Sequence, residues 1–263
     1  MRYESQAALR PESMRPFRLR MATLHRQTEA RQRACARLYH LYILRLLRWR
    51  AGGQPAQRPV FMAVVADQLH MDSAAVVIFD DKRHELLTAV SDDTARAAHE
   101  AESVLGDGPT LDIAAGTDRV LATGAEVTRS WPQFGRVADD LGIHTVLAVP
   151  LRVVSRRLGA LCGYSRRSST NDDALTRAAR VADTLSSTVL LAEQNDSNEL
   201  VLRGTLFDDA DYPSIVNQAT GVVAAQHGHD LDTALALLRA RAFAEGVSLS
   251  ELAHRVLERC RSR

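Results

Sequence analysis

The stretch TVLAVPLRVVSRRLGALCGYS, residues 145–165, decides the fold of most of this chain. It contains two runs rich in β-branched and aliphatic residues, 145–153 and 157–165, joined by a short polar turn. Such a pair predicts an antiparallel hairpin. Because side chains alternate between the two faces of a strand, every second residue of the latter run is expected on one buried face: Leu158, Ala160, Cys162 and Tyr164.

The sequence before and after this hairpin predicts the rest of one domain. Residues 74–80 and 86–90 are two further β-rich runs around a polar turn, so they predict a second hairpin. Apolar residues at helical spacing predict helices at 61–69, 94–104 and 173–194. Since the strands come in hairpins and do not alternate with helices, the pattern favours an α+β domain with an antiparallel sheet over a doubly wound parallel one.

Short motifs in this region resemble those of GAF domains, over about residues 60–195. The motifs occur in one order along the chain: LGDGP at 105–109, SWPQF at 130–134, LGI at 141–143, AVPL at 148–151 and LGAL at 158–161. The resemblance implies a six-stranded antiparallel sheet with flanking helices, often in a dimer, that holds a small-molecule pocket on one face. It does not imply which ligand is bound.

Four side chains are candidates for such a ligand pocket: Trp131, Phe134, His144 and Tyr164. The pair Trp131 and Phe134 also fits a structural packing corner, and His144 also fits a surface position. If the domain held a cofactor, His144 or Cys162 would be the residue that binds it, although no cofactor is evident. Redox enzymes among GAF folds use paired cysteines, whereas only Cys162 lies in this domain. With no metal-ligand spacing or nucleophile–base motif either, we expect neither a metal site nor an enzyme.

A second unit follows in IVNQATGVVAAQHGHDLDTALALLRARAFAEGVSLSELAHRVL, residues 215–257. Its three apolar-periodic runs are separated by glycines: Gly228 suits a left-handed helix C-cap, and Gly246 ends the second helix. Asp230 predicts one helix N-cap, and Ser248 with Glu251 predicts a capping box. Three helices with short loops indicate a small three-helix bundle, whose core is thin because large apolar side chains are few.

The spacing of small and apolar residues in this bundle resembles an ANTAR domain, over about residues 201–258. It reads Gln218-Ala219-x-Gly221, then Ala234-Leu235-x-x-Leu238-Arg239, then Leu252-Ala253-x-x-Val256. The resemblance implies a dimer that binds hairpin loops in nascent transcripts, so that a terminator cannot form. The residues expected to contact RNA are Gln218, Thr220, Arg239, Arg241, Arg255 and Arg259.

This chain departs from the ANTAR pattern at two cationic positions. Thr220 stands where a lysine is usual, and Pro213 stands in place of an arginine. From 211 to 263 the unit carries six arginines and six acidic residues, so it is neutral. Because cations supply most of the affinity for phosphates, an alternative stays open: a degenerate ANTAR unit that dimerises or docks a protein partner without RNA.

The first 60 residues are strongly basic, with 13 arginines and three glutamates, whereas the whole chain has a net charge of +1. Such a segment suits nucleic acid or another acidic surface. The apolar residues around Leu38 and Tyr42 have helical spacing, which also allows a basic amphipathic helix on a membrane or against a partner. A third possibility is a mis-annotated start, since Met14, Met21 and Met62 could each initiate translation.

Three segments are therefore expected: a basic extension at 1–59, a GAF sensor domain at 60–195 and an ANTAR output domain at 196–263. Three scattered cysteines and the absence of an apolar run of about 20 residues indicate a cytoplasmic protein without a membrane span. The function predicted from the two resemblances is a signal-responsive, homodimeric regulator that binds RNA hairpins and controls transcription termination. Its expected partners are RNA and an unidentified small-molecule effector.

Overall fold

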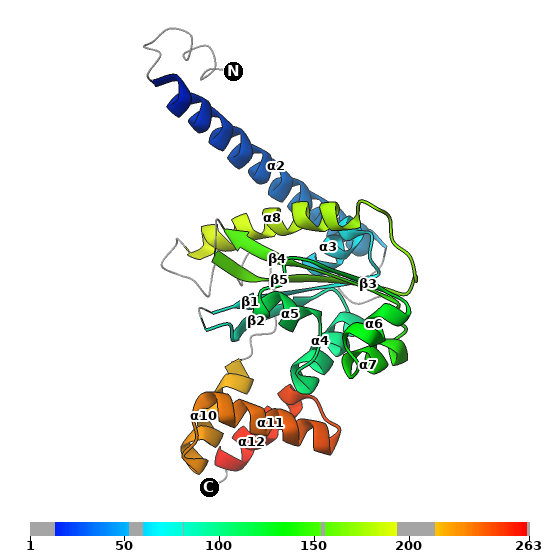
Figure 1. Cartoon of the computed structure of the whole chain (residues 1–263), viewed down its shortest axis with the longest axis vertical. Coiled ribbons are helices and arrows are strands. Elements are labelled where there is room, and N and C mark those ends of the chain that lie inside the picture. Colours follow the sequence, from blue (N-terminus) through cyan, green and yellow to red (C-terminus); the bar gives the residue numbers. More distant parts are fainter. Residues whose placement is uncertain (1–13, 53–59, 81, 154–155, 194–213, 262–263) are drawn as a thin grey trace.

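The computed structural model of the chain describes residues 14–52, 60–80, 82–153, 156–193 and 214–261. Figure 1 shows a long N-terminal helix, an α+β domain and a helical bundle at the C-terminal end. The elements follow in this order: α2 (Arg15–Ala51), α3 (Phe61–Leu69), β1 (Ser73–Phe79), β2 (Glu85–Val90), α4 (Asp93–Leu105), α5 (Pro109–Ala115), β3 (Val120–Thr123), α6 (Ala125–Ser130), α7 (Phe134–Asp140), β4 (Thr145–Val153), β5 (Arg156–Ser165), α8 (Ala174–Glu193), α10 (Ser214–His227), α11 (Leu231–Glu245) and α12 (Leu249–Arg261). The predicted α+β domain and three-helix bundle are confirmed.

The sheet has five strands in the order β2-β1-β5-β4-β3, and all its pairings are antiparallel. The family resemblance implied six strands, so this sheet is smaller within the described residues. Between the two hairpins the chain forms four short helices, α4 to α7, and contributes only the edge strand β3.

The predicted alternation along β5 is wrong at Leu158. Leu151 pairs with Gly159, whereas the next residue of β4, Arg152, pairs with Arg157, which leaves Leu158 as the extra residue of a β-bulge. The bulge moves Leu158 into the same hydrophobic cluster as Leu161. The other members of the predicted face line the opposite side of the sheet, as expected: Ala160, Cys162 and Tyr164.

Gly159 follows the bulge, at a position where the backbones of β5 and β1 come very close. A Cβ atom on Gly159 would lie 2.0 Å from the carbonyl oxygen of Val77. This contact gives the LGAL motif a structural reason, because only a residue without a side chain fits there.

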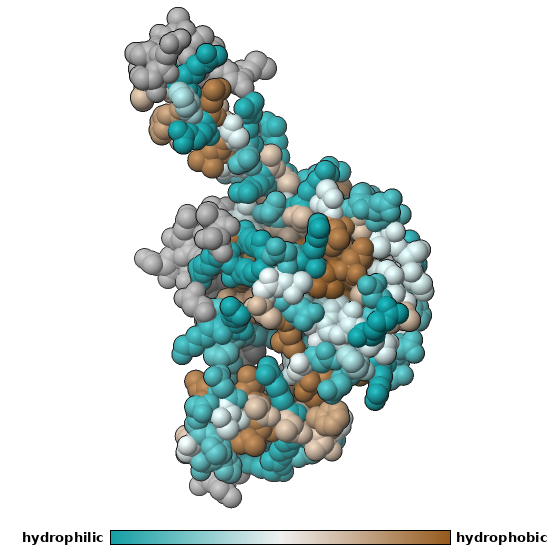
Figure 2. All heavy atoms as spheres, viewed as in Figure 1, coloured by the Kyte–Doolittle hydropathy of each residue, from teal (hydrophilic) through white to brown (hydrophobic). Residues whose placement is uncertain are grey.

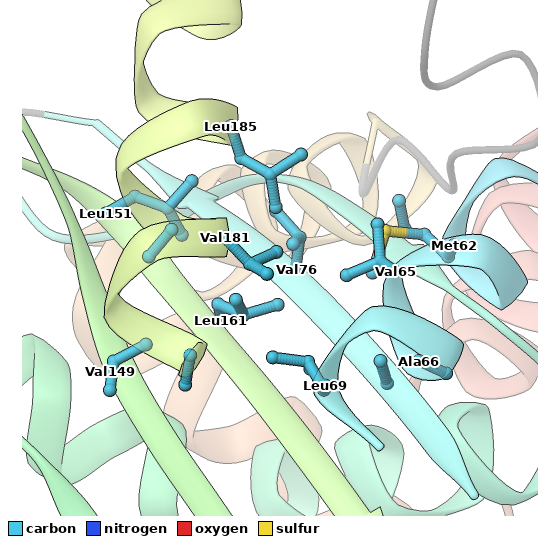
Figure 3. Packing of buried hydrophobic residues seen from close by; sticks show 14 of the residues in the cluster. Met62, Val65, Ala66, Leu69, Val76, Val149, Leu151, Leu161, Val181 and Leu185 are labelled. Atoms are coloured by element: carbon cyan, nitrogen blue, oxygen red, sulfur yellow. The ribbon is translucent and has the colours of Figure 1, made fainter. Parts of the chain in front are cut away.

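Helices cover both faces of the sheet. The helices α3 and α8 lie over one face, where Figure 3 shows Met62, Val65 and Leu69 from α3 pointing toward Leu161 of β5 and Leu185 of α8. The four short helices α4 to α7 cover the other face, on which Trp131 and Phe134 pack edge to face with ring centroids 6.0 Å apart. The hydrophobic core of the domain is thus divided into two layers by the sheet.

The N-terminal helix α2 belongs to the α+β domain only through its C-terminal half. Leu38 and Tyr42 are buried against α3 and α8, and the Tyr42 ring meets Phe61 at 5.9 Å. The N-terminal half of α2 extends beyond the domain, at the end of the molecule opposite the bundle (Figure 1).

The predicted N-caps of the bundle are confirmed, but the Glu251 carboxylate pairs with Arg255 and does not complete the predicted capping box. Asp230 accepts a hydrogen bond from the backbone of Thr233 at 2.8 Å, and Ser248 accepts one from the backbone of Glu251 at 3.1 Å. The C-cap Gly246 is left-handed, with φ of 64°. The core of the bundle is small, as expected: Val216, Ala219, Leu238, Ala242, Leu249, Leu252 and Ala253.

Candidate functional site

The LGDGP turn after α4 organises the helical face of the domain. Gly106 ends α4 in the left-handed conformation, with φ of 66°. The Asp107 carboxylate then accepts hydrogen bonds from the backbone of Gln133 at 2.9 Å and of Phe134 at 3.3 Å. Two of the motifs that suggested the fold are therefore joined directly. Gly108 leaves room for Glu102, whose Cγ would lie 2.4 Å from a Cβ at this position.

Glu102 is the centre of a buried polar cluster beneath α4 and α5. Its side chain is 1% exposed. One carboxylate oxygen accepts a hydrogen bond from the backbone of Thr110 at 2.7 Å, and the other accepts one from the Tyr164 hydroxyl at 3.1 Å. The Thr110 hydroxyl also lies 3.2 Å from the sulfur of Cys162. The cluster thus links α4, α5 and β5.

Burial sets the ionisation of this cluster. Removal from water raises the pKa of Glu102 to about 7, even though His99 and the hydrogen bonds from Thr110 and Tyr164 favour its charged form. Burial and the nearby Glu102 also raise the pKa values of Cys162 and Tyr164. Near neutral pH, Glu102 is therefore the group of this cluster whose charge can change.

A second polar group, next to the first, joins α4 to β2. The Nε2 atom of His99 lies 3.0 Å from both carboxylate oxygens of Glu85 and 3.1 Å from the Thr88 hydroxyl. Burial opposes the charged form of His99, but the Glu85 carboxylate outweighs it and raises the histidine pKa. Burial likewise opposes the charged form of Glu85, and His99 nevertheless keeps the pKa of that carboxyl below its usual value. The two side chains form a charged pair.

A cleft of about 540 Å³ opens beside these groups, between the α+β domain and the bundle. Such a volume lies in the usual range for small-molecule sites. Arg96, His99 and Glu102 line it from α4, and Thr220 and Arg239 line it from α10 and α11. The buried Nδ1 of His99 and the buried Nε of Arg239 have no hydrogen-bond partner among the described residues. Each of the two units thus contributes to the cleft lining one residue with a buried, unsatisfied nitrogen.

The bundle is held against the α+β domain by an apolar contact and by charges. Val104, in the last turn of α4, packs on the hydrophobic core of the bundle. At the cleft, the His84 Nε2 atom lies 3.1 Å from a carboxylate oxygen of Asp232. Burial lowers the pKa of Arg239, while the carboxylate of Glu85 opposes this effect. Arg239 thus faces the α+β domain in this arrangement.

The four side chains predicted to line a ligand pocket lie elsewhere than the cleft. Trp131 and Phe134 are buried, and the Trp131 indole donates a hydrogen bond to Asp112 at 3.0 Å. The ring of His144 is partly exposed, 3.9 Å from Asp139. Tyr164 reaches the cleft only through its hydrogen bond to Glu102. The role of these residues in ligand binding stays a prediction.

The residues predicted to bind RNA do not form one surface. Gln218, Arg241 and Arg259 are exposed. Thr220 is buried, and its hydroxyl donates to the Val216 carbonyl at 2.7 Å. Arg241 and the half-buried Arg255 both pair with Glu245, at 2.6 and 3.1 Å.

An exposed aromatic ring on the bundle was not anticipated. The Phe243 side chain is 63% exposed, on α11 one turn after Arg239. The thin core is filled by alanine at position 242 instead, so the phenylalanine faces solvent.

The polar cluster was also missed. Residues 94–104 form an alanine- and glutamate-rich helix, a composition typical of an exposed face, and nothing in it distinguishes Glu102 from Glu100. A usable signal was the spacing of His99 and Glu102, because residues three apart share one side of a helix.

Searches for two other kinds of site gave no candidate. Among the residues that the structure describes, no group of His, Cys, Asp and Glu side chains is arranged to hold a metal ion. None of the helices in the described ranges is both long and apolar enough to cross a membrane.

Comparisons with known proteins support the division into two folded units. A family model described as GAF domain matches residues 61–189, and one described as ANTAR domain matches residues 211–257. No curated protein matches the chain significantly.

Similar solved structures include a domain of a two-component sensor histidine kinase protein from Sinorhizobium meliloti. It has 17% identity and a TM-score of 0.41, and the match covers 52% of this chain and 91% of that one. The GAF domain of a phosphoenolpyruvate-protein phosphotransferase from Coxiella burnetii has 14% identity and a TM-score of 0.37, with coverages of 58% and 94%. At these values the structures add no argument to the family matches.

Proposed function

Because the chain belongs to the proteins that join a GAF domain, residues 61–189, to an ANTAR domain, residues 211–257, we propose that it is a signal-responsive regulator of transcription termination. In this proposal the ANTAR bundle binds hairpin loops in nascent transcripts and prevents a terminator from forming. The GAF domain binds a small-molecule effector that controls this binding. The protein acts in the cytoplasm as a homodimer, and it catalyses no reaction.

The observation that carries the proposal is the ANTAR match itself, and three exposed side chains of the bundle support it. RNA loops are recognised by aromatic stacking on splayed bases, by hydrogen bonds to base edges and by cations on phosphates. Phe243, Gln218 and Arg259 are exposed and supply one group of each kind.

The proposal predicts that the full-length protein binds RNA carrying two hairpin loops from its own transcripts. Arg239→Gln is expected to weaken this binding about tenfold for every loop sequence, because a phosphate contact contributes the same energy whatever the bases. Fluorescence anisotropy at low salt measures both affinities. Arg136→Gln, an exposed position on α7, is the control and leaves the affinity unchanged. If the wild-type protein binds none of these hairpins, the proposed function is wrong.

The position of the cleft between the two domains supports a mechanism in which docking of the bundle on the GAF domain limits RNA binding. Arg239 and Thr220 both line it in the docked arrangement, so RNA that needs Arg239 competes with docking. An effector that occupied the cleft would change this competition only by binding one arrangement better than the other.

Val104→Asp tests whether docking limits RNA binding. The substitution places a carboxylate against the hydrophobic core of the bundle, which favours separation of the domains. We expect several-fold tighter RNA binding in the anisotropy assay. Thr94→Asp adds the same charge to the first turn of α4, where it suits the helix dipole, and is expected to change nothing. Unchanged affinity in both variants would exclude docking as the control.

A second function is favoured by the position of Thr220. Where the ANTAR pattern has a lysine, this side chain is buried and bonded to its own helix, so it offers no cation. In this alternative the bundle dimerises or docks a protein partner without RNA. Crosslinking and sequencing in cells separates the two functions, because only the first enriches RNA.

A further inference from the structure

The positive charge of this protein is concentrated on α2, away from the proposed RNA-binding bundle. Helix α2 carries ten arginines and one glutamate in 37 residues. The family models match residues 61–189 and 211–257, so neither includes this helix. In Figure 1 its N-terminal half extends from the α+β domain at the end opposite the bundle.

The arginines of α2 include a spaced row along one side of the helix. At about 100° per residue, five exposed arginines fall within a sector of about 60°: Arg15, Arg26, Arg33, Arg37 and Arg48. At a rise of about 1.5 Å per residue, this row is about 50 Å long. Arg15, Arg37 and Arg48 make no ion pair with any residue that the structure describes.

The opposite side of α2 is apolar, and the domain fixes its direction. Cys35, Leu38 and Tyr42 pack into the core of the α+β domain, which turns the arginine row outward. In Figure 2 hydrophilic residues lie along the helix, with hydrophobic ones between them. The row is therefore a fixed basic surface of a rigid element.

We propose that this arginine row binds the phosphate backbone of nucleic acid without sequence preference. Phosphates repeat about every 3.4 Å along one strand of a duplex, so a row of about 50 Å can contact several of them. The guanidinium group suits phosphate because its planar set of donors matches the phosphate oxygens. The row gives the protein a general nucleic-acid contact separate from hairpin recognition.

Two other occupants fit the helix less well. A membrane-surface helix lays its apolar side in the lipid, whereas the C-terminal half of this apolar side is already buried in the protein. A second copy of α2 would bring ten arginines against ten, and the repulsion would oppose pairing along this row.

The balance of charge in the bundle supports a separate phosphate contact. Residues 211–263 hold as many acidic residues as arginines, and the described ion pairs of Arg241 and Arg255 are with glutamates. Long-range attraction to a polyanion has to come from another part of the chain, and α2 has the charge for it.

The test uses the full-length protein and a loop-free RNA duplex of about 20 base pairs, with a DNA duplex of the same sequence as a second probe. The variant Arg15→Gln, Arg37→Gln, Arg48→Gln removes three charges and keeps good helix formers. We expect the affinity for both duplexes to fall at least about tenfold at about 100 mM salt. The slope of log affinity against log salt should become shallower by about 2 to 3.

The matched control removes three exposed arginines elsewhere on the surface: Arg119→Gln, Arg129→Gln, Arg136→Gln. It changes the net charge equally and should lose far less affinity. The proposal is overturned by an equal loss in the control, by absence of duplex binding in the wild type, or by binding to anionic phospholipid vesicles alone. Binding to one duplex and not the other keeps the phosphate contact and identifies the nucleic acid.

This result is independent of the proposed hairpin function. Duplex binding that α2 carries, without any preference for hairpins, would leave the arginine row established and exclude antitermination. Hairpin binding that the triple variant leaves unchanged, together with no duplex binding, would support antitermination and exclude the arginine row as a nucleic-acid contact.

Discussion

Gly159→Ala is expected to destabilise the GAF domain severely. The new methyl group would lie 2.0 Å from the Val77 carbonyl oxygen, and both atoms belong to paired backbones in the centre of the sheet. Neither strand can move without breaking its hydrogen bonds to the other neighbour. We expect a loss of at least about 4 kcal/mol in the free energy of unfolding, against a total of about 5–15 kcal/mol for a typical domain. Urea denaturation followed by circular dichroism measures it.

Gly163→Ala is the matched control, four residues further along the same strand. There the added methyl group would meet the side chain of Met71, with Cγ at 2.9 Å. Because a methionine side chain can change rotamer, the cost should be about 1 kcal/mol. Similar midpoints for the two variants would show that the close approach of β5 to β1 does not require glycine.

Glu102→Gln is expected to reduce the pH dependence of stability near neutrality. Burial raises the pKa of Glu102 to about 7, from 4.5 in the absence of such effects. A carboxyl group with a raised pKa contributes stability that is complete below its unfolded value and is lost as the pH rises through its folded value. The wild type should thus lose about 3 kcal/mol between about pH 4.5 and about pH 7.5. Glutamine carries no charge, so the variant avoids this loss.

The measurement is the free energy of unfolding of both proteins from pH 5 to pH 8. We expect the difference, variant minus wild type, to become more positive by about 2 to 3 kcal/mol across this range. The pKa of His99 is also raised, so its contribution to the free energy of unfolding also falls as the pH rises. Because His99 is present in both proteins, this contribution largely cancels in the difference. The exposed Glu126→Gln should give a curve parallel to that of the wild type. Parallel curves for Glu102→Gln would mean that this carboxyl is not desolvated.

Hydrophobic periodicity predicted the two hairpins and the longer helices, because it depends on local pattern, but it predicted none of the short elements α5, β3, α6 and α7. The strand at 145–153 and the helix at 61–69 have the expected bounds. Periodicity failed at Leu158, since the bulge arises from the register between two strands and leaves no trace in one of them. The exposure of Phe243 was missed for a related reason: a helix with alanine on several sides does not define which face is buried.

The candidate site was harder to predict than the fold. Glu85, His99 with Glu102, and Arg239 come from three separate elements, β2, α4 and α11, and each has an ordinary local context. The motif LGDGP has a role that cannot be predicted from its local sequence. It places Gly108 against Glu102 and connects Asp107 to the backbone of Gln133, and both contacts depend on the tertiary fold.

The last turn of α4 has a consequence for how a signal travels in this protein. It carries Glu102, which faces the polar cluster, and Val104, which supports the bundle. These residues are two positions apart, about 3 Å along the helix axis. A displacement at the carboxyl therefore reaches the neighbouring domain through one turn of a single helix, without a relay of intermediate side chains.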